Sequence, residues 1–220
     1  MSAVELDNHE KLTGLYARVA PVYDAWTWFT ESKSLRVALE LAAIRDGERV
    51  LEVAVGTGYV FREILRRNPS GRNVGVDMTE SMLRRARTKA DRSGISFELT
   101  IGDARALSFE DASFDVVVNN NMLGLLSESD IASSLHEMER VLRPGGRLVI
   151  VMMKRPARGI GEWIYRIGAG RLGGWRDVTI DPLIDSSGLE RVSRQRVTQL
   201  GIPSEVLVAR KLEPSDAPRH

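Results

Sequence analysis

Residues Arg49–Gly58, which read R-V-L-E-V-A-V-G-T-G, decide the fold of this chain. Val50, Leu51 and Val53 form a short apolar run of the kind found in strands buried on both faces of a parallel sheet. The run breaks at Gly56-Thr57-Gly58, and a helical apolar pattern follows directly. A strand, a glycine turn and a helix in this order let a nucleotide-like ligand lie against bare backbone at the helix N-terminus.

The residues around the turn indicate which ligand this is. Phe61 stands where the dinucleotide fingerprint needs a third glycine, and no Walker A loop is present in the sequence. Glu52, inside the strand, repels phosphate but suits a ligand that carries an ammonium group and a cationic sulfur. Asp77 ends a second predicted strand 19 residues after Gly58, where an acid accepts hydrogen bonds from ribose hydroxyls. The residues therefore predict S-adenosylmethionine as the ligand.

Length and composition narrow the class of protein. The 220 residues suit one domain with a large core, and a net charge of +1 gives no general attraction to nucleic acid. The absence of cysteine excludes disulfides and thiolate catalysis. The first residues are polar and acidic, unlike a signal peptide, and no apolar run reaches the ~20 residues of a membrane helix. We therefore expect a cytoplasmic protein, with peripheral membrane contact as the alternative.

The apolar periodicity predicts an α/β fold in which strands alternate with helices. We expect a Rossmann-like, doubly wound, seven-stranded sheet, mostly parallel with an antiparallel C-terminal hairpin strand, and N-terminal helices that cover the site. The predicted helices cover residues 5–18, 31–44, the stretch that Thr79 opens as its N-cap, and the stripe Ile131, Leu135, Met138 and Leu142. The predicted strands include 95–101, 114–119, 189–197 and 205–212, and a turn is predicted at 143–146. We expect residues 1–212 to form a single domain. Its predicted parts are an N-terminal helical cap (1–44), a cofactor-binding core (45–153), a substrate-side lid segment (154–176) and a C-terminal helix and hairpin (177–212), followed by a tail (213–220).

Five phrases carry a resemblance to a known family. L-E-V-A-V-G-T-G, V-G-V-D-M, G-D-A-R-A-L-S-F, F-D-V-V-V and V-L-R-P-G-G-R-L resemble, in order and spacing, the motifs of class I S-adenosylmethionine-dependent methyltransferases across residues 45–153. Ala54, where many members have glycine, and the upstream Y-A-R-V-A-P-V-Y-D are similar to the ubiquinone/menaquinone C-methyltransferase branch. The phrase S-M-L-R-R-A-R is similar to bacterial phospholipid N-methyltransferases.

The resemblance implies a set of cofactor-binding residues. The methionine end is assigned to the turn and the ribose to Asp77, while Met78 covers one face of the adenine and Asp103 with Ala104 meets its amine and ring. Gly58 is expected to leave room for the methionine end, so that Gly58→Val blocks it. The full predicted set is Tyr16, Glu52, Ala54, Gly56, Thr57, Gly58, Asp77, Met78, Asp103, Ala104, Asn119 and Asn120.

The acceptor of the methyl group is less well defined by the resemblance. The quinone enzymes continue after Tyr23-Asp24 with a methionine-asparagine pair, and they carry a glycine-leucine-arginine-asparagine phrase after strand four. This chain has Ala25–Trp28 and Met122–Leu125 in these places. The resemblance therefore predicts the cofactor-binding residues but not a quinone substrate. We expect a small or lipid-like acceptor that is methylated at N, O or C.

Methyl transfer from a sulfonium is an in-line displacement that needs no metal, and the sequence offers no histidine cluster to bind one. Where the nucleophile arrives protonated, the candidate catalytic residues are Asp24, as the base, and Tyr23 beside it. Asp24 is otherwise a helix-flanking acid that caps backbone. His9 is a weaker candidate, and His136 lies off the apolar stripe of its helix.

Aromatic and basic residues outside the core indicate the substrate side. All four tryptophans and three of the four tyrosines fall before residue 30 or between 160 and 176. Ile160, Trp163, Ile164 and Ile167 share one helical face within the basic segment 154–176, which suits contact with an anionic membrane. In the alternative reading this stripe caps the pocket. Three other functions stay open: a phospholipid N-methyltransferase, a non-catalytic S-adenosylmethionine-binding protein and a nicotinamide oxidoreductase.

Overall fold

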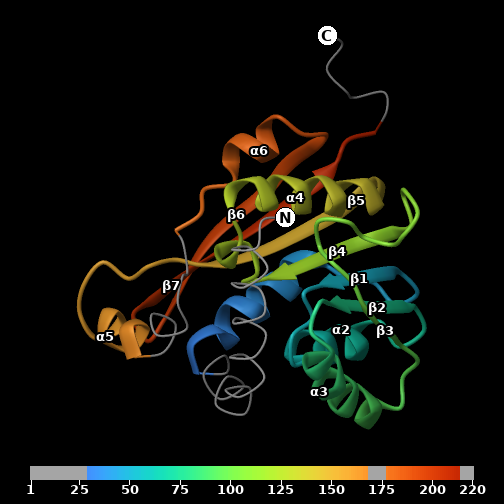
Figure 1. The fold of residues 1–220 in the computed structure, drawn as a ribbon, viewed down its shortest axis with the longest axis horizontal. Helices are drawn as coiled ribbons and strands as arrows, with labels where there is room; N and C mark the ends of the chain where they lie inside the picture. Colours follow the sequence, from blue (N-terminus) through green and yellow to red (C-terminus); the bar gives the residue numbers. More distant parts are fainter. Residues whose placement is uncertain (1–28, 168–176, 214–220) are drawn as a thin grey trace, which may run out of the picture.

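The computed structural model describes residues 29–167 and 177–213, and one seven-stranded sheet runs through them (Figure 1). The strands lie in the order β3-β2-β1-β4-β5-β7-β6. Their bounds are β1 Arg49–Val53, β2 Arg72–Asp77, β3 Glu98–Ile101, β4 Phe114–Asn120, β5 Leu142–Met153, β6 Leu189–Gln199 and β7 Ile202–Lys211. Strands β1 to β5 pair in parallel, whereas β7 is antiparallel to both β5 and β6. The predicted fold class, including the C-terminal hairpin, is confirmed.

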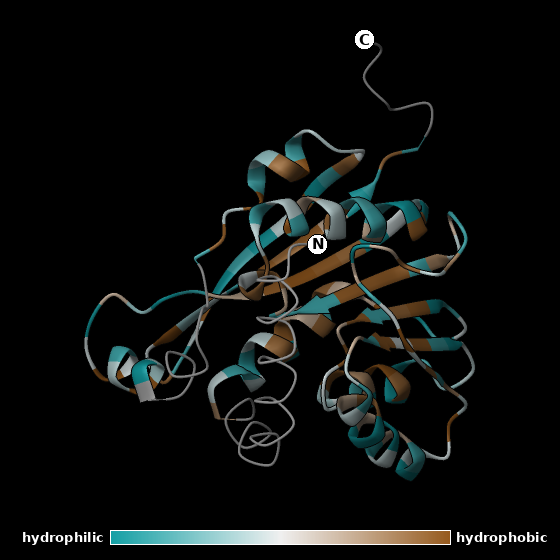
Figure 2. Ribbon diagram, viewed as in Figure 1, coloured by the Kyte–Doolittle hydropathy of each residue, from teal (hydrophilic) through white to brown (hydrophobic). Residues whose placement is uncertain are grey.

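Helices cover both faces of this sheet (Figure 1). The described part of the chain contains a helix over residues 29–42, α2 (Tyr59–Arg67), α3 (Glu80–Ala90), α4 (Glu128–Val141), α5 (Ile160–Ile167), which lies at the end of the sheet where β7 begins, and α6 (Asp181–Asp185). The helix over 29–42 and α2 pack on one face, through a cluster that includes Leu35, Leu39, Val60, Ile64, Val116 and Val149. Helices α4 and α6 pack on the other face, through a cluster that includes Leu51, Val117, Leu135, Met138, Ile150 and Ile184. The central strands are therefore apolar on both faces, as Figure 2 shows for β4 and β5.

Three predicted boundaries differ from the structure. Strand β3 begins at Glu98 rather than Ile95: Ile95, Phe97 and Leu99 all pack against the cluster between α2 and α3, but only Leu99 of the three pairs with β2. Helix α4 ends at Val141, and Leu142 already pairs with Phe114 of β4. The predicted turn at 143–146 is an irregularity within β5, since the register moves there from Leu142 to Arg147.

The predicted N-cap of α3 is only partly right. Thr79 occupies the N-cap position, but its side chain makes no capping hydrogen bond. Its backbone N–H instead donates to Asp77 Oδ1 at 2.8 Å. The helix start is thus fixed by the acid that ends β2.

The predictions for residues 5–18 and 214–220 fall outside the described residues. Within 29–167 and 177–213, no helix is long and apolar enough to cross a bilayer. The same ranges contain no group of three or more His, Asp or Glu side chains placed to hold a metal ion.

Candidate functional site

The glycine turn after β1 lies at the carboxyl edge of the parallel strands. Ala54, Gly56 and Gly58 all have positive φ angles, of 61°, 53° and 80°. A positive φ costs little free energy for glycine but strains alanine. At Ala54 the turn therefore holds the backbone in a conformation that alanine disfavours. Gly58 is the N-cap of α2, and the turn therefore delivers the helix N-terminus to the strand edge.

The two glycines have different surroundings. A Cβ added to Gly56 would meet no atom within 4 Å. Gly56 lines a cleft that opens at this edge of the sheet. A Cβ added to Gly58 would come within 2.7 Å of the Ala86 Cα in α3. Gly58 therefore lets α2 and α3 approach each other, and the expectation that a side chain there would enter the methionine site is wrong. Gly56 therefore leaves bare backbone open to the cleft.

Asp77 ties this turn to β2. Its Oδ2 accepts from the Gly56 N–H at 2.8 Å, and its Oδ1 accepts from the Thr79 N–H at the same distance. Burial raises the pKa of Asp77, and the two backbone hydrogen bonds oppose this rise. Each carboxylate oxygen keeps a further lone pair, so Asp77 can accept hydrogen bonds from a ligand while it holds the turn.

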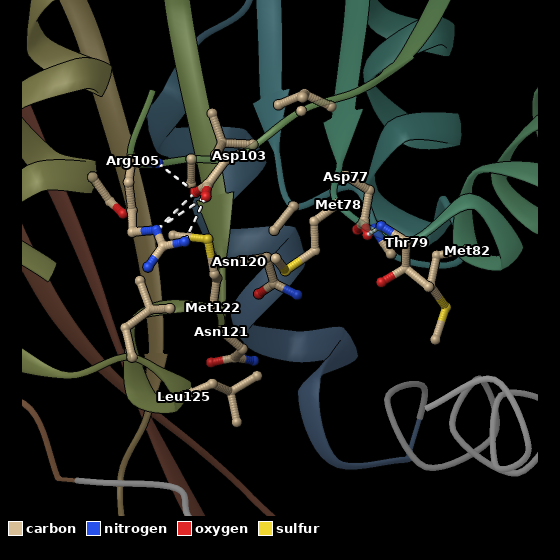
Figure 3. Close-up of a pocket in the computed structure, with 18 residues that line it drawn as sticks. Asp77, Met78, Thr79, Met82, Asp103, Arg105, Asn120, Asn121, Met122 and Leu125 are labelled. Atoms are coloured by element: carbon tan, nitrogen blue, oxygen red, sulfur yellow. Dashed lines mark hydrogen bonds and ion pairs between the residues drawn. The ribbon is translucent and has the colours of Figure 1, made fainter. Parts of the chain in front are cut away.

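The opposite rim of the cleft is built around an arginine that the sequence reading passed over. Arg105 donates to both carboxylate oxygens of Asp103, at 2.7–3.0 Å (Figure 3). Its Nη1 donates to Asp130 of α4 at 3.0 Å. Asp103 is therefore held in a fixed orientation by a neighbouring cation. The spacing Asp103-x-Arg105 was visible in the sequence, but its partner Asp130 lies 25 residues away from Arg105.

Most of the cleft between these rims is apolar. Met78 is 45% exposed, and together with Met82 and Met122 it presents sulfur-containing side chains to the cleft (Figure 3). The remaining apolar lining comes from Val53, Val76, Ala104, Leu125 and Leu126. A flat, apolar ring with a few polar edges fits such walls.

The floor of the cleft is polar and begins where β4 ends. Asn120 and Asn121 line the cleft, whereas the Asn119 side chain turns away and donates to the Val53 carbonyl at 3.0 Å. Asn121 Nδ2 donates to Glu31 Oε2 at 2.6 Å, and Asn121 Oδ1 accepts from the Met153 N–H at 2.6 Å. Neither Glu31 nor Asn121 was predicted as a site residue. The sequence places Glu31 on the helical face that continues with the apolar residues Leu35, Ala38, Leu39 and Ala42, and this position indicates that Glu31 is buried.

Glu52 lies beneath the turn and does not line the cleft. It is 1% exposed, and its Oε2 has no hydrogen-bond partner among the described residues. Burial, and then repulsion from Asp77, raise its pKa well above the ordinary value. Thr57 is buried as well, at 4% exposure. The predicted set therefore divides into residues that line the cleft (Ala54, Gly56, Asp77, Met78, Asp103, Ala104 and Asn120) and residues behind them (Glu52, Thr57, Gly58 and Asn119).

The comparisons with known proteins agree with this geometry. The family described as "Methyltransferase domain" matches residues 50–146. The demethylmenaquinone methyltransferase of Thermus thermophilus is 33% identical over 157 residues, which cover 70% of each chain. The ubiquinone/menaquinone biosynthesis C-methyltransferase of Paracoccus denitrificans is 34% identical over 170 residues, which cover 74% of this chain and 67% of that protein.

The chain belongs to the class I S-adenosylmethionine-dependent methyltransferases, in their ubiquinone/menaquinone C-methyltransferase-like branch. Its cofactor is accordingly S-adenosylmethionine, as the sequence predicted. Among solved structures, the N-methyltransferase NodS of Bradyrhizobium japonicum, in complex with S-adenosyl-L-homocysteine, superposes with a TM-score of 0.66 at 19% identity. The alignment covers 83% of this chain and 88% of NodS, and at this identity it supports the fold alone.

The residues of this methyltransferase fit its cofactor. The open space above Gly56 admits a ligand against the backbone, and the apolar walls suit a purine ring. Among the described residues, the buried side-chain oxygens without a partner include Glu52 Oε2, Asn119 Oδ1 and Asn120 Oδ1, and the Asp77 carboxylate lines the cleft itself. Such acceptors match a ligand that carries both an ammonium and a sulfonium group better than they match a phosphate.

The predicted catalytic residues Asp24 and Tyr23, and the predicted cofactor residue Tyr16, lie outside the described residues. In the predicted lid segment, Ile160 and Trp163 of α5 are 69% and 64% exposed and do not line the cleft. Tyr165 and Ile164 of the same helix pack against Met153 and Ile202.

Proposed function

We propose that this methyltransferase transfers the methyl group of S-adenosylmethionine to a ring carbon of a small quinol-like acceptor. The observation that carries the proposal is the match to named quinone C-methyltransferases over about 70% of the chain, combined with an apolar cleft next to the glycine turn. The named activity of those relatives is the reason to test quinols before other acceptors.

In this proposal the cofactor lies along the cleft with its methionine end over Gly56 and its adenine between Met78 and Ala104. Asp77 receives the ribose hydroxyls, because Asp77 is the last residue of β2 and its carboxylate lines the cleft. Asp103, fixed by Arg105, receives the adenine amine. Asn120 meets the methionine end from the floor, and the support for this is that Asn120 lines the same cleft as Ala54 and Gly56.

The cofactor supplies an electrophilic methyl group for an in-line displacement. The protein must hold the acceptor carbon about 3 Å from that methyl group in a site that excludes water. A quinol carbon becomes a better nucleophile when a ring hydroxyl loses its proton, which is the task proposed for Asp24, with Tyr23 beside it.

The acceptor end of the cleft differs from that of the quinone enzymes to which the sequence was likened. Met122 and Leu125 line this end, in the stretch where those enzymes carry an arginine and an asparagine. The apolar lining supports an acceptor with few polar substituents on the ring near this edge. A lipid-like acceptor delivered from a membrane stays a prediction, and the exposed Ile160 and Trp163 of α5 are the residues to replace in a vesicle-binding assay.

The test is a turnover assay with methyl-labelled S-adenosylmethionine and product identification by mass. The panel contains a demethylated menaquinol, a demethylated ubiquinol, a simple catechol and vesicles that contain phosphatidylethanolamine. The proposal expects a carbon-methylated quinol and no methylated phospholipid. A panel in which only phosphatidylethanolamine is methylated would overturn it, because that acceptor reacts at nitrogen.

A further inference from the structure

Helix α5 and the turn of the β6–β7 hairpin together form a small exposed apolar surface, the apolar tip, which consists of Ile160, Trp163 and Leu200. These side chains are 69%, 64% and 51% exposed. The two segments touch through glycines, since a Cβ added to Gly161 would lie 2.2 Å from the Gly201 carbonyl oxygen. Figure 1 shows α5 beside this end of the hairpin. The apolar tip is therefore one surface built from two parts of the chain.

Packing within the chain does not account for the exposure of the apolar tip. Helix α5 already buries a different face, because Tyr165 is 8% exposed and packs with Met153 and Ile202 at the end of the sheet. A surface helix usually presents polar side chains away from its buried face, but Ile160 and Trp163 occupy that position in α5. Neither side chain lines the cleft, so covering the cofactor does not explain them.

Basic side chains surround the apolar tip. The stretch 155–166 contains three arginines and one acid, Glu162. Arg158 and Arg166, which flank the α5 part of the tip along the chain, are both exposed. Lys33 is also exposed, and its backbone N–H donates at 2.7 Å to Gln199 Oε1, in the residue that precedes the turn. The charge around the tip therefore suits an anionic surface.

The size and composition of the apolar tip favour a lipid surface over a protein partner. A stable protein interface uses about 20–30 residues on each side, whereas the tip offers three apolar side chains from a helix and a turn. Tryptophan beside aliphatic and basic side chains is typical of segments that lie at the boundary between headgroups and acyl chains.

We propose that the apolar tip inserts into the surface of an anionic lipid bilayer, with Arg158, Arg166 and Lys33 against the lipid headgroups. The sequence indicated α5 alone for such contact. The structure adds Leu200 from the hairpin turn, 37 residues after Trp163 in the chain, and the Gly161–Gly201 contact that joins the two segments.

The apolar tip is connected to the cofactor cleft through the start of the helix over 29–42. Gln199 Nε2 donates to the Phe29 carbonyl at 2.6 Å, which ties the hairpin to this helix. Two residues further on, Glu31 accepts a hydrogen bond from Asn121, which lines the cleft. Docking therefore holds the cleft near the bilayer in which an apolar acceptor is dissolved. This last step rests on the quinol-like acceptor proposed above.

The test is co-sedimentation with vesicles of phosphatidylcholine alone and of phosphatidylcholine mixed with phosphatidylglycerol. The wild type should bind the mixed vesicles, and more weakly as the salt concentration rises. Trp163→Ser and Leu200→Ser should each lower the partition coefficient about tenfold, because each removes a large apolar side chain from the bilayer. Val192→Ser is the matched control, since Val192 is 52% exposed but lies near the other end of β6, and it should bind like the wild type.

Two results would overturn the proposal. One is a wild type that does not bind the mixed vesicles, and the other is binding that neither Trp163→Ser nor Leu200→Ser weakens. Self-association that Leu200→Ser abolishes, in a protein that does not bind vesicles, would assign the apolar tip to a second copy of the chain and would equally overturn it.

Methyl transfer is measured separately, to a short-chain quinol in solution and to a long-chain quinol in the mixed vesicles. Trp163→Ser and Leu200→Ser should keep the wild-type rate with the soluble quinol and lose about tenfold with the embedded one at limiting vesicle concentration, in line with their weaker partition. A wild type that binds the vesicles and methylates neither quinol would refute the proposed function and support the docking surface.

Discussion

The burial of Glu31 predicts a specific effect of pH on stability. Its pKa is about 7 in the folded chain, and it returns to about 4.5 in the unfolded chain. Between these values the native state binds the proton more tightly than the unfolded state does. The stability that Glu31 contributes is therefore fully present below pH 4.5 and is lost as the pH rises through 7.

The magnitude follows from the difference between the two pKa values. A difference of one unit corresponds to about 1.4 kcal/mol, so the shift of Glu31 is worth about 3 kcal/mol over the whole range, and about 2.5 kcal/mol of this is lost between pH 5 and pH 8. Glu31→Gln does not titrate, and its stability lacks this loss. For a chain of this size, the difference between the melting temperatures of the two proteins should change by roughly 5–10 °C over the same interval.

The assay is reversible urea unfolding of the wild type and Glu31→Gln at unit steps from pH 5 to pH 8. Other titrating groups, Glu52 and Asp77 included, are common to both proteins and cancel in the difference. The stability of Glu31→Gln relative to the wild type should rise steadily with pH. Two curves that stay parallel within about 0.5 kcal/mol would show that Glu31 does not take up a proton in the native state, and the reasoning from its burial would fail.

Four further substitutions test the site. Asp77→Ala should weaken cofactor affinity by roughly 10- to 150-fold, which raises the KM for S-adenosylmethionine with little change in kcat. It should also lower the melting temperature, because Asp77 accepts the Gly56 N–H. An unchanged KM would contradict the ribose assignment. Gly56→Ala should reduce S-adenosylhomocysteine binding in a folded protein, measured by calorimetry. Gly58→Ala should instead destabilise the fold by roughly 1–3 kcal/mol through its contact with Ala86, measured by unfolding. Unfolding of Gly56→Ala together with lost binding in a stable Gly58→Ala would count against these roles. Asp24→Ala should lower kcat and leave cofactor affinity intact, and a loss of affinity alone would remove Asp24 as the base.

Much of the core was predictable because its signals are local. The β-branched runs around Leu51 and Val117 and the stripe that includes Leu135 appear in the structure as two-sided strands and a one-sided helix. The mostly parallel sheet was predicted from the alternation of strands with helices, and its antiparallel C-terminal hairpin from two strands joined by a short loop. The start of β3 was not predictable in this way, since Ile95, Phe97 and Leu99 alternate alike and pack in the same cluster, yet only Leu99 of the three pairs with β2.

The parts of the site that were missed depend on contacts between segments distant in the chain. Gly58 and Gly56 look alike in the sequence, and only the position of Ala86 in α3 separates a packing glycine from a ligand-facing one. Glu31 and Asn121 are 90 residues apart and become a pair only when the helix over 29–42 covers the end of β4. Arg105 was passed over because its role depends on Asp130 in α4.

The central claim is that the cleft over the glycine turn binds S-adenosylmethionine, and it is tested most directly by ligand titration. Calorimetry and thermal shift with S-adenosylhomocysteine, NAD and ATP compare the predicted ligand with two that carry phosphates. We expect S-adenosylhomocysteine to bind at one site and, at a hundredfold excess over its Kd, to stabilise the fold by about 2.7 kcal/mol. NAD and ATP should give neither heat nor a shift. Tight NAD binding with no response to S-adenosylhomocysteine would contradict the account.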